Sequence, residues 1–156
     1  MSIVKADAFA NAAGMILDTF TFVDLHRTLE LNPSEGDRFK QNLRDVLQGT
    51  LALEKLLSGR TGAEAASRPK VEVSTSVRFD SQSSSHSTIL ELVAQDRPGL
   101  LFDVSSVLAD QGCNIEVALI DTEGQRAIDV FYLTCRGAKI DPMRQEAVGD
   151  ALCTRL

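Results

Sequence analysis

The chain has 156 residues, 44% of them hydrophobic, and a formal net charge of -6 at pH 7. That length suits one or two small domains, each with a thin core. Binding to a phosphate backbone requires clustered Lys and Arg, and the 16 basic residues are scattered among 22 acidic ones, so nucleic-acid binding is not expected. The apolar runs are shorter than the roughly 18–20 residues that span a bilayer, and no signal peptide precedes them. These features predict a cytoplasmic protein without a membrane partner.

The first third of the chain predicts a β-hairpin followed by a helix. Residues 3–10 alternate loosely, Asn11–Gly14 supplies a turn, and Met15–Val23 is mostly apolar, β-branched or aromatic, as in paired strands. A helix is expected after Asn32, because Pro33 suits a first helical turn and Ser34 is a candidate N-cap.

A linker and an additional strand come next. Ser58–Pro69 is rich in small residues and glycine, which is typical of a linker. Val71–Phe79 predicts one strand, and Thr88–Ala94 predicts another after a polar loop. Because the chain stops at its last helix, we expect Val71–Phe79 to take the edge position that a final strand would otherwise occupy.

The remainder of the chain predicts a helix, two strands and a last helix. Pro98 suits the first turn of the helix, and Gly112 suits its left-handed C-terminus. The apolar residues expected to share a face are Leu100, Leu101, Val104, Val107 and Leu108 on the helix, and Ile115, Val117 and Leu119 on the next strand. A turn at Glu123–Gln125, a second strand and a helix from Pro142 complete a β-α-β-β-α order. This is a split βαβ pattern, an antiparallel sheet with both helices on one face.

A segment of the chain occurs twice. Ile3–Asp24 aligns without gaps with Asn114–Cys135, so that Leu17-Asp18-Thr19-Phe20 falls on Ile128-Asp129-Val130-Phe131. Only the second copy is preceded by a strand and a helix, so the repeat predicts one and a half copies of one domain. The expected boundaries are 1–57 for the partial domain, 58–70 for the linker and 71–156 for the complete domain.

The turn at Asp96–Leu101 is the candidate binding feature. Pro98 disfavours helical geometry at Arg97, and Gly99 allows another molecule to approach the backbone closely. The helix that begins there offers free N–H groups around residues 99–101 and a positive dipole end, which together favour a carboxylate. Asp96 could accept from an ammonium group, so the turn suits a zwitterionic amino acid. The alternative is that Asp96 only caps its own helix and that Pro98-Gly99 makes a tight turn.

Asp18 and Asp129 occupy matching positions in the two copies, inside apolar strands. A carboxylate there is costly unless it is paired or faces solvent. Either these residues contact a ligand or partner, or they lie on a solvated sheet face or pair with a neighbouring arginine.

No catalytic constellation emerges from the sequence. Hydrolase-nucleophile, phosphate-loop and dinucleotide motifs are absent. The three cysteines lack metal-ligand spacing, and their odd number argues against a disulfide framework. We therefore expect no enzyme activity, no metal site and no cofactor.

Two motifs of the second half resemble the ACT domain, a small-molecule-sensing module of amino-acid metabolism. They are Asp96-Arg97-Pro98-Gly99-Leu100-Leu101-Phe102-Asp103 and, about a helix later, Gly112-Cys113-Asn114-Ile115. Thr122-Glu123-Gly124 with Arg126–Leu133 is similar to the last ACT domain of the bacterial PII uridylyltransferase/uridylyl-removing enzymes. Gly14–Phe20 resembles the equivalent strand of their penultimate ACT domain. The resemblance covers nearly the whole chain.

The resemblance implies a ferredoxin-like α+β fold and a regulatory pair of domains that binds an amino acid, with glutamine as the expected ligand. ACT ligands sit between domains, against the first strand–helix loop and the start of the second strand. Carried over, the site consists of Asp96, Arg97, Pro98, Gly99, Leu100, Leu101 and Asn114. The enzymes that the chain resembles have a nucleotidyltransferase domain and a metal-dependent phosphohydrolase domain upstream. We expect neither domain in this chain.

A ligand-free module for dimerisation or protein interaction is the second interpretation. The partial domain leaves Met15–Val23 and the apolar face of the Phe39–Leu47 helix without part of their cover. Exposed apolar surface costs roughly 25 cal/mol per Å², and an unpaired strand edge invites pairing. We expect the partial domain to complete itself against the complete domain or against a second chain, in the latter case as a symmetric homodimer.

Overall fold

The computed structural model describes residues 2–11, 13–24, 27–58 and 72–156. Apart from its first residue, the predicted linker at 58–70 lies outside these ranges. The chain divides into two compact units. The first is formed mainly by Phe22–Pro69, and the second by Ile3–Thr21 together with Lys70–Leu156.

The first unit is helical. Its helices are α1 (Thr28–Leu31), α2 (Pro33–Leu47) and α3 (Leu53–Ser58). Helix α2 begins where the sequence predicts, with Pro33 in its first turn, but its N-cap residue is Asn32. The predicted N-cap, Ser34, lies one residue inside the helix, and its hydroxyl donates to Asn32 Oδ1 at 2.6 Å.

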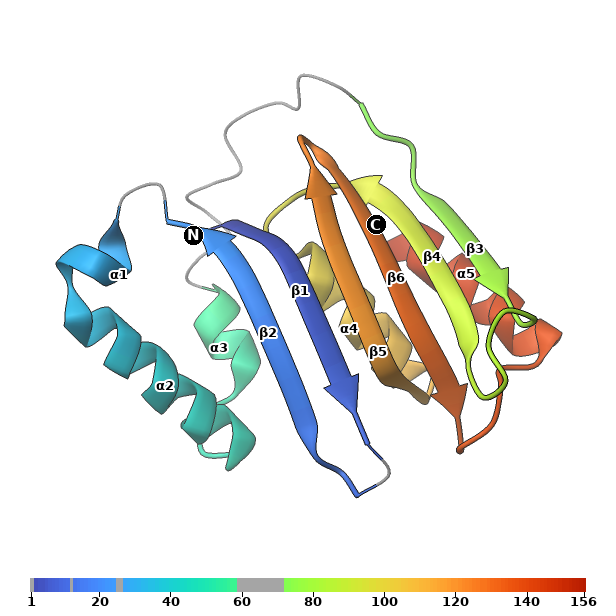
Figure 1. The fold of residues 1–156 in the computed structure, drawn as a ribbon, viewed down its shortest axis with the longest axis horizontal. Helices are drawn as coiled ribbons and strands as arrows, with labels where there is room; N and C mark the ends of the chain where they lie inside the picture. Colours follow the sequence, from blue (N-terminus) through green and yellow to red (C-terminus); the bar gives the residue numbers. More distant parts are fainter. Residues whose placement is uncertain (1, 12, 25–26, 59–71) are drawn as a thin grey trace. The chain divides into compact units, whose positions relative to one another are not determined.

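The second unit is built on a six-stranded antiparallel sheet with the order β2-β1-β5-β6-β4-β3 (Figure 1). The strands are β1 (Ser2–Ala10), β2 (Ile16–Val23), β3 (Ser76–Asp80), β4 (Thr88–Gln95), β5 (Cys113–Glu123) and β6 (Arg126–Cys135). With α4 (Leu100–Asp110) and α5 (Pro142–Arg155), they give the predicted β-α-β-β-α order from β4 onward. The predicted ferredoxin-like α+β fold is confirmed.

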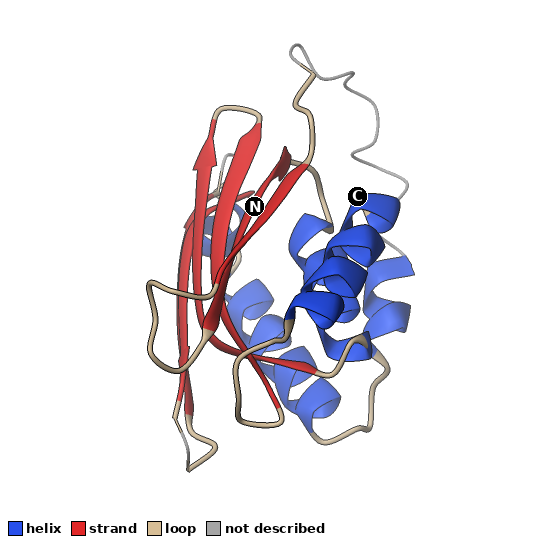
Figure 2. Ribbon diagram, turned by 90° about the vertical axis from the view of Figure 1, so that its right-hand side faces the viewer, coloured by secondary structure: helices blue, strands red, loops and turns tan. Residues whose placement is uncertain are grey.

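The core lies between the sheet and helices α4 and α5, which cover one face of it (Figures 1 and 2). The strands contribute Leu90, Leu92, Ala118, Ile120, Phe131 and Leu133, and the helices contribute Leu100, Val104, Leu108, Val148 and Leu152. Burial of each large aliphatic side chain stabilises the fold by roughly 1.5–3 kcal/mol. The predicted apolar stripe of α4 is therefore its core-facing side.

Strand β3 lies at an edge of the sheet and pairs with β4, as predicted for this segment. The strand is shorter than predicted, because it begins at Ser76 and residues 72–75 are outside it. Val71 lies outside the described residues. The N–H of Val73 donates to Gln95 Oε1 at 3.2 Å, so the side chain of Gln95 fixes the backbone that precedes β3.

The prediction that Ile115, Val117 and Leu119 share one face of β5 is wrong. The register with β6 shifts between Ile115 and Val117, and such an irregularity at Glu116 reverses the alternation of side chains. Ile115 packs against the core, but further along the strand Ile120 takes the buried position, and Leu119 is 38% exposed.

Strands β1 and β5 meet in a register that matches the sequence repeat. In the gapless alignment of the two copies, Ala6 corresponds to Val117 and Phe9 corresponds to Ile120. In the sheet, Ala6 is paired with Ile120, and Phe9 is paired with Val117. The two strands that the alignment matches therefore pair about a local two-fold relation, as identical strands do in a symmetric dimer.

Candidate functional site

The segment of residues 96–101 comprises the link between β4 and α4, at one end of the sheet, and the first two residues of α4. Gly99 is the N-cap residue of α4 and has a φ of 84°, a conformation that glycine adopts without strain. A Cβ atom at Gly99 would meet no atom within 4 Å, so the backbone here is open to an approaching molecule. The N–H of Leu100 donates to the carbonyl of Arg97 at 3.1 Å, which removes it from the donors predicted to meet a ligand.

Arg97 is held by the helix that it precedes. Its Nη2 atom lies 2.7 Å from Asp103 Oδ2, and Nη2 of Arg155 on α5 lies 2.8 Å from Asp103 Oδ1. Burial raises the pKa of Asp103, but the hydrogen bonds from the two guanidinium groups outweigh burial and hold that pKa below its ordinary value. The guanidinium group of Arg97 is therefore already paired, through Nη2, with a carboxylate of α4.

Asp96 is half-buried beside the turn between β5 and β6. Its backbone N–H donates to the carbonyl of Gln125 at 2.9 Å. Burial raises the pKa of the Asp96 carboxyl, opposed by the backbone N–H of Arg97. Asp96 does not cap α4, because Gly99 is the N-cap residue and no side chain accepts a hydrogen bond there. The carboxylate therefore stands beside the helix terminus without being used by it.

Asp129 is a buried carboxylate on the core-facing side of β6. In register it is paired with Leu92 of β4 and with Ile120 of β5. Its relative exposure is 0%, and neither of its oxygens has a hydrogen-bond partner among the described residues. Buried polar groups are nearly always paired, so this carboxylate calls for a physical explanation.

Burial raises the pKa of Asp129 to about 7. The backbone of Asp121 opposes part of this rise, without a hydrogen bond of ordinary geometry, and the negative charges of Asp96 and Asp121 increase it. At neutral pH the Asp129 carboxyl is therefore divided between its neutral and ionised forms. The charge of Asp96, in the 96–101 segment, is thus one of the causes of the raised pKa of Asp129.

Asn114 lies at the other end of the sheet. It is paired with Thr134 on β6, whereas Gln95, which precedes the 96–101 segment, is paired with Arg126. The strand from 126 to 134 spans about 26 Å at roughly 3.3 Å per residue. The fold thus brings residues 96–101 together and leaves Asn114 apart. One small ligand cannot contact both groups within this sheet.

The structure separates the two aspartates that the repeat aligns. Asp18 is exposed on β2, which agrees with the interpretation of a solvated sheet face. Asp129 is neither solvated nor paired with an arginine, so that interpretation fails for it. The alternation of residues along β6 predicts the burial of Asp129, because Asp129 stands two residues from both Ala127 and Phe131. Residues in step along a strand share a face, and both of these neighbours are in the core.

Within the described ranges, no group of three or more His, Cys, Asp or Glu side chains could hold a metal ion. The thiols of Cys113, Cys135 and Cys153 are free. Burial and the neighbouring Cys135 raise the pKa of Cys113, which Arg144 opposes, and a raised thiol pKa gives a weak nucleophile. No helix in the described part of the chain is long and apolar enough to cross a membrane.

Comparison with protein families gives one match. Residues 88–139 match the model of the ACT domain, a range that begins with β4 and includes both the 96–101 segment and Asp129.

Several known proteins align with nearly the whole chain. The bifunctional uridylyltransferase/uridylyl-removing enzyme of Bradyrhizobium diazoefficiens is 35% identical over 156 residues, which cover 97% of this chain and 16% of that enzyme. The enzyme of the same name from Gluconobacter oxydans is 34% identical over 158 residues, covering 99% and 17%. That from Caulobacter vibrioides is 32% identical over 146 residues, covering 92% and 15%. No solved structure gives a significant match.

These comparisons confirm the resemblance predicted from the sequence. The chain is similar to the ACT domain over 88–139 and, over most of its length, to part of these uridylyltransferases. It spans about a sixth of the length of the curated relatives that it matches. The ACT model matches the chain once, so the predicted partial second copy stays a prediction.

Proposed function

We propose that this chain is a regulatory, non-catalytic module that binds an amino acid, with glutamine as the first candidate. The observation that carries the proposal is the open backbone at Gly99, at the N-terminus of α4 and beside the half-buried Asp96. A helix N-terminus favours a carboxylate, and the Asp96 carboxylate favours an ammonium group. A zwitterion satisfies both. The ACT match over 88–139 includes this segment.

The name of the relatives suggests the setting. They are bifunctional uridylyltransferase/uridylyl-removing enzymes, and this chain aligns with about a sixth of each. We propose that the chain acts as the regulatory part of such an enzyme in the cytoplasm. Amino-acid binding here would be reported to catalytic domains that belong to other parts of that enzyme.

The proposed organisation is a complete ACT-type domain over 71–156 and a partial copy over 1–57. The register of β1 with β5 supports it, because equivalent positions pair about a two-fold relation. Since Lys5 is paired with Asp121, the start of β1 lies at the same end of the sheet as the 96–101 segment. We propose that the amino acid binds between the end of β1 that contains Lys5 and the 96–101 segment. In the proposed homodimer, Asn114 of one chain would then contact the amino acid bound at the 96–101 segment of the other chain.

Calorimetric titration of the full chain with glutamine and the other common amino acids tests the proposal. Saturable glutamine binding is expected. Asp96→Ala should weaken it about tenfold to a hundredfold, because a charge-assisted hydrogen bond contributes roughly 1.5–3 kcal/mol. Asp110→Ala is the matched control, since it removes a carboxylate from the opposite end of α4. Gly99→Val should block the ligand's approach, and it also strains the backbone at a φ of 84°.

Thermal melting of each variant separates lost binding from lost folding. Glutamine affinity that is unchanged in a folded Asp96→Ala variant would remove Asp96 from the site. If no amino acid binds the wild type at about 10 mM, a range in which even weak sites fill, the sensing proposal fails.

A ligand-free association module is the second candidate function. Strand β2 is an edge of the sheet, and Ile16 and Leu17 are 68% and 67% exposed on it. An apolar, unpaired edge strand invites pairing with another chain. Light scattering should show a dimer that Leu17→Lys converts to monomer. Thr19→Lys is the control, because it adds a charge to the same exposed strand without removing an apolar side chain, and it should leave the dimer intact. A dimer that binds no amino acid would favour this function, and a compact monomer at high protein concentration would reject it.

A further inference from the structure

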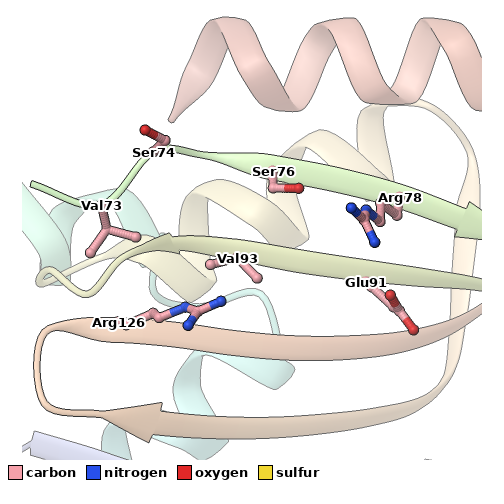
Figure 3. A pocket seen from close by; sticks show the side chains of 7 residues that line it. All are labelled: Val73, Ser74, Ser76, Arg78, Glu91, Val93 and Arg126. Atoms are coloured by element: carbon pink, nitrogen blue, oxygen red, sulfur yellow. The ribbon is translucent and has the colours of Figure 1, made fainter.

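The open face of the sheet, opposite α4 and α5, carries a hollow of about 400 Å³ over β3, β4 and β6. Its polar lining consists of Ser74, Ser76, Arg78, Glu91 and Arg126, as Figure 3 shows. Val73 and Val93 supply its apolar surface. Glu91 and Val93 alternate along β4 with the buried Leu90 and Leu92, which fixes the hollow on the face away from the core.

The charged groups of this hollow have no partners in the part of the chain that the structure describes. Among the described residues, Arg78, Glu91 and Arg126 make no ion pair or side-chain hydrogen bond. This holds although Arg78 and Glu91 are paired in the register of β3 with β4. Acidic residues outnumber basic ones by 22 to 16 in the chain, so two unpaired guanidinium groups beside one hollow are not explained by a shortage of carboxylates.

One end of the hollow is held in place by Gln95. Its Oε1 atom accepts from the N–H of Val73 at 3.2 Å, and its Nε2 atom donates to the carbonyl of Gln125 at 2.9 Å. Through these bonds, Gln95 of β4 connects Val73, which precedes β3, to the turn between β5 and β6. Arg126 begins β6 directly after that turn. The backbone of residues 73–74 and the backbone of Arg126, on two sides of the hollow, are therefore fixed relative to each other.

We propose that this hollow binds a small α-amino dicarboxylate, at a site separate from the 96–101 segment. Each guanidinium group can hold a carboxylate in bidentate fashion, so Arg78 and Arg126 complement two carboxylates. Glu91 complements the ammonium group and disfavours a dicarboxylate that lacks one. Val93 receives a short methylene chain. The volume lies near the lower end of the roughly 300–1,000 Å³ of small-molecule sites, which suits a ligand of this size.

Titration of the full chain at low salt with L-glutamate, glutarate and L-glutamine tests the proposal. Glutamate should bind with a Kd of about 1 mM or below, and glutarate about tenfold more weakly, because glutarate lacks the ammonium group. Arg78→Gln and Arg126→Gln should each weaken glutamate binding about tenfold. Glu91→Gln should reverse the preference in favour of glutarate. Arg136→Gln is the matched control, since it removes the same charge just past the other end of β6 and should change nothing.

The outcome is distinguishable from that of the proposed amino-acid site. Asp96→Ala should leave glutamate binding unchanged, and Arg126→Gln should leave glutamine binding unchanged. In amide NMR spectra of the wild type, the shifts caused by glutamate should be confined to β3, β4 and the start of β6. The proposal is overturned if glutamate does not bind at about 10 mM. It is equally overturned if glutamate and glutarate bind alike, or if glutamate shifts only residues 96–101 and its binding depends on Asp96.

Discussion

Replacing Asp129 by asparagine should stabilise the folded chain at neutral and alkaline pH. The carboxyl group is fully buried, and its oxygens have no hydrogen-bond partner in the described part of the chain. Its pKa rises from an ordinary value of 3.8 to about 7 in the folded state. Each pKa unit corresponds to about 1.4 kcal/mol, so the ionised carboxylate destabilises the folded state by about 4 kcal/mol above neutral pH.

The sign of the pH dependence follows from the raised pKa of Asp129. Because the folded state holds the proton more tightly than the unfolded state, the contribution of this group to stability is complete below pH 3.8 and is lost as the pH rises to about 7. Asparagine cannot ionise. The difference in free energy of unfolding between Asp129→Asn and wild type should therefore grow from near zero at about pH 4 to about 4 kcal/mol by about pH 8.

Urea unfolding of both proteins across this pH range measures the difference directly. Asp18→Asn is the matched control, because it is the same substitution at the equivalent position of the repeat, on the exposed strand β2. Its effect should stay within about 0.5 kcal/mol at every pH. A stability difference for Asp129→Asn that does not change with pH, or a variant less stable than wild type at pH 8, would refute the reasoning.

Three further substitutions test how the fold is held. Thr88→Val should destabilise by roughly 1–3 kcal/mol in chemical unfolding, because the buried hydroxyl accepts from the N–H of Ile140 at 3.0 Å and valine leaves that donor unpaired. Asp103→Asn should cost about 1 kcal/mol at low salt and less at high salt, since Arg97 in its ion pair is partly exposed; a cost independent of salt would contradict this account. Gly112→Ala should cost about 1 kcal/mol in thermal unfolding through strain at a φ of 67°, and an unchanged melting temperature would contradict it.

Local signals in the sequence were sufficient for most elements of the second unit. Gly112 follows α4 with a positive φ, and Pro142 lies in the first turn of α5, as expected. Caps, turns and periodicity act over a few residues, so they can be interpreted without knowledge of the rest of the chain. Residues 96–101 are together for the same reason, because they are consecutive.

The sequence by itself therefore determined the order of elements from β4 onward, the ferredoxin-like class and the open turn at Gly99. Only the tertiary structure decided which side chains meet across strands and helices. The irregularity at Glu116 turns Leu119 outward, and the register leaves Asn114 at the far end of the sheet from Asp96. Arg155 reaches Asp103 across 52 residues of sequence. Such contacts depend on strand register and helix packing, which residues distant in the sequence fix jointly, and no local pattern carries that information.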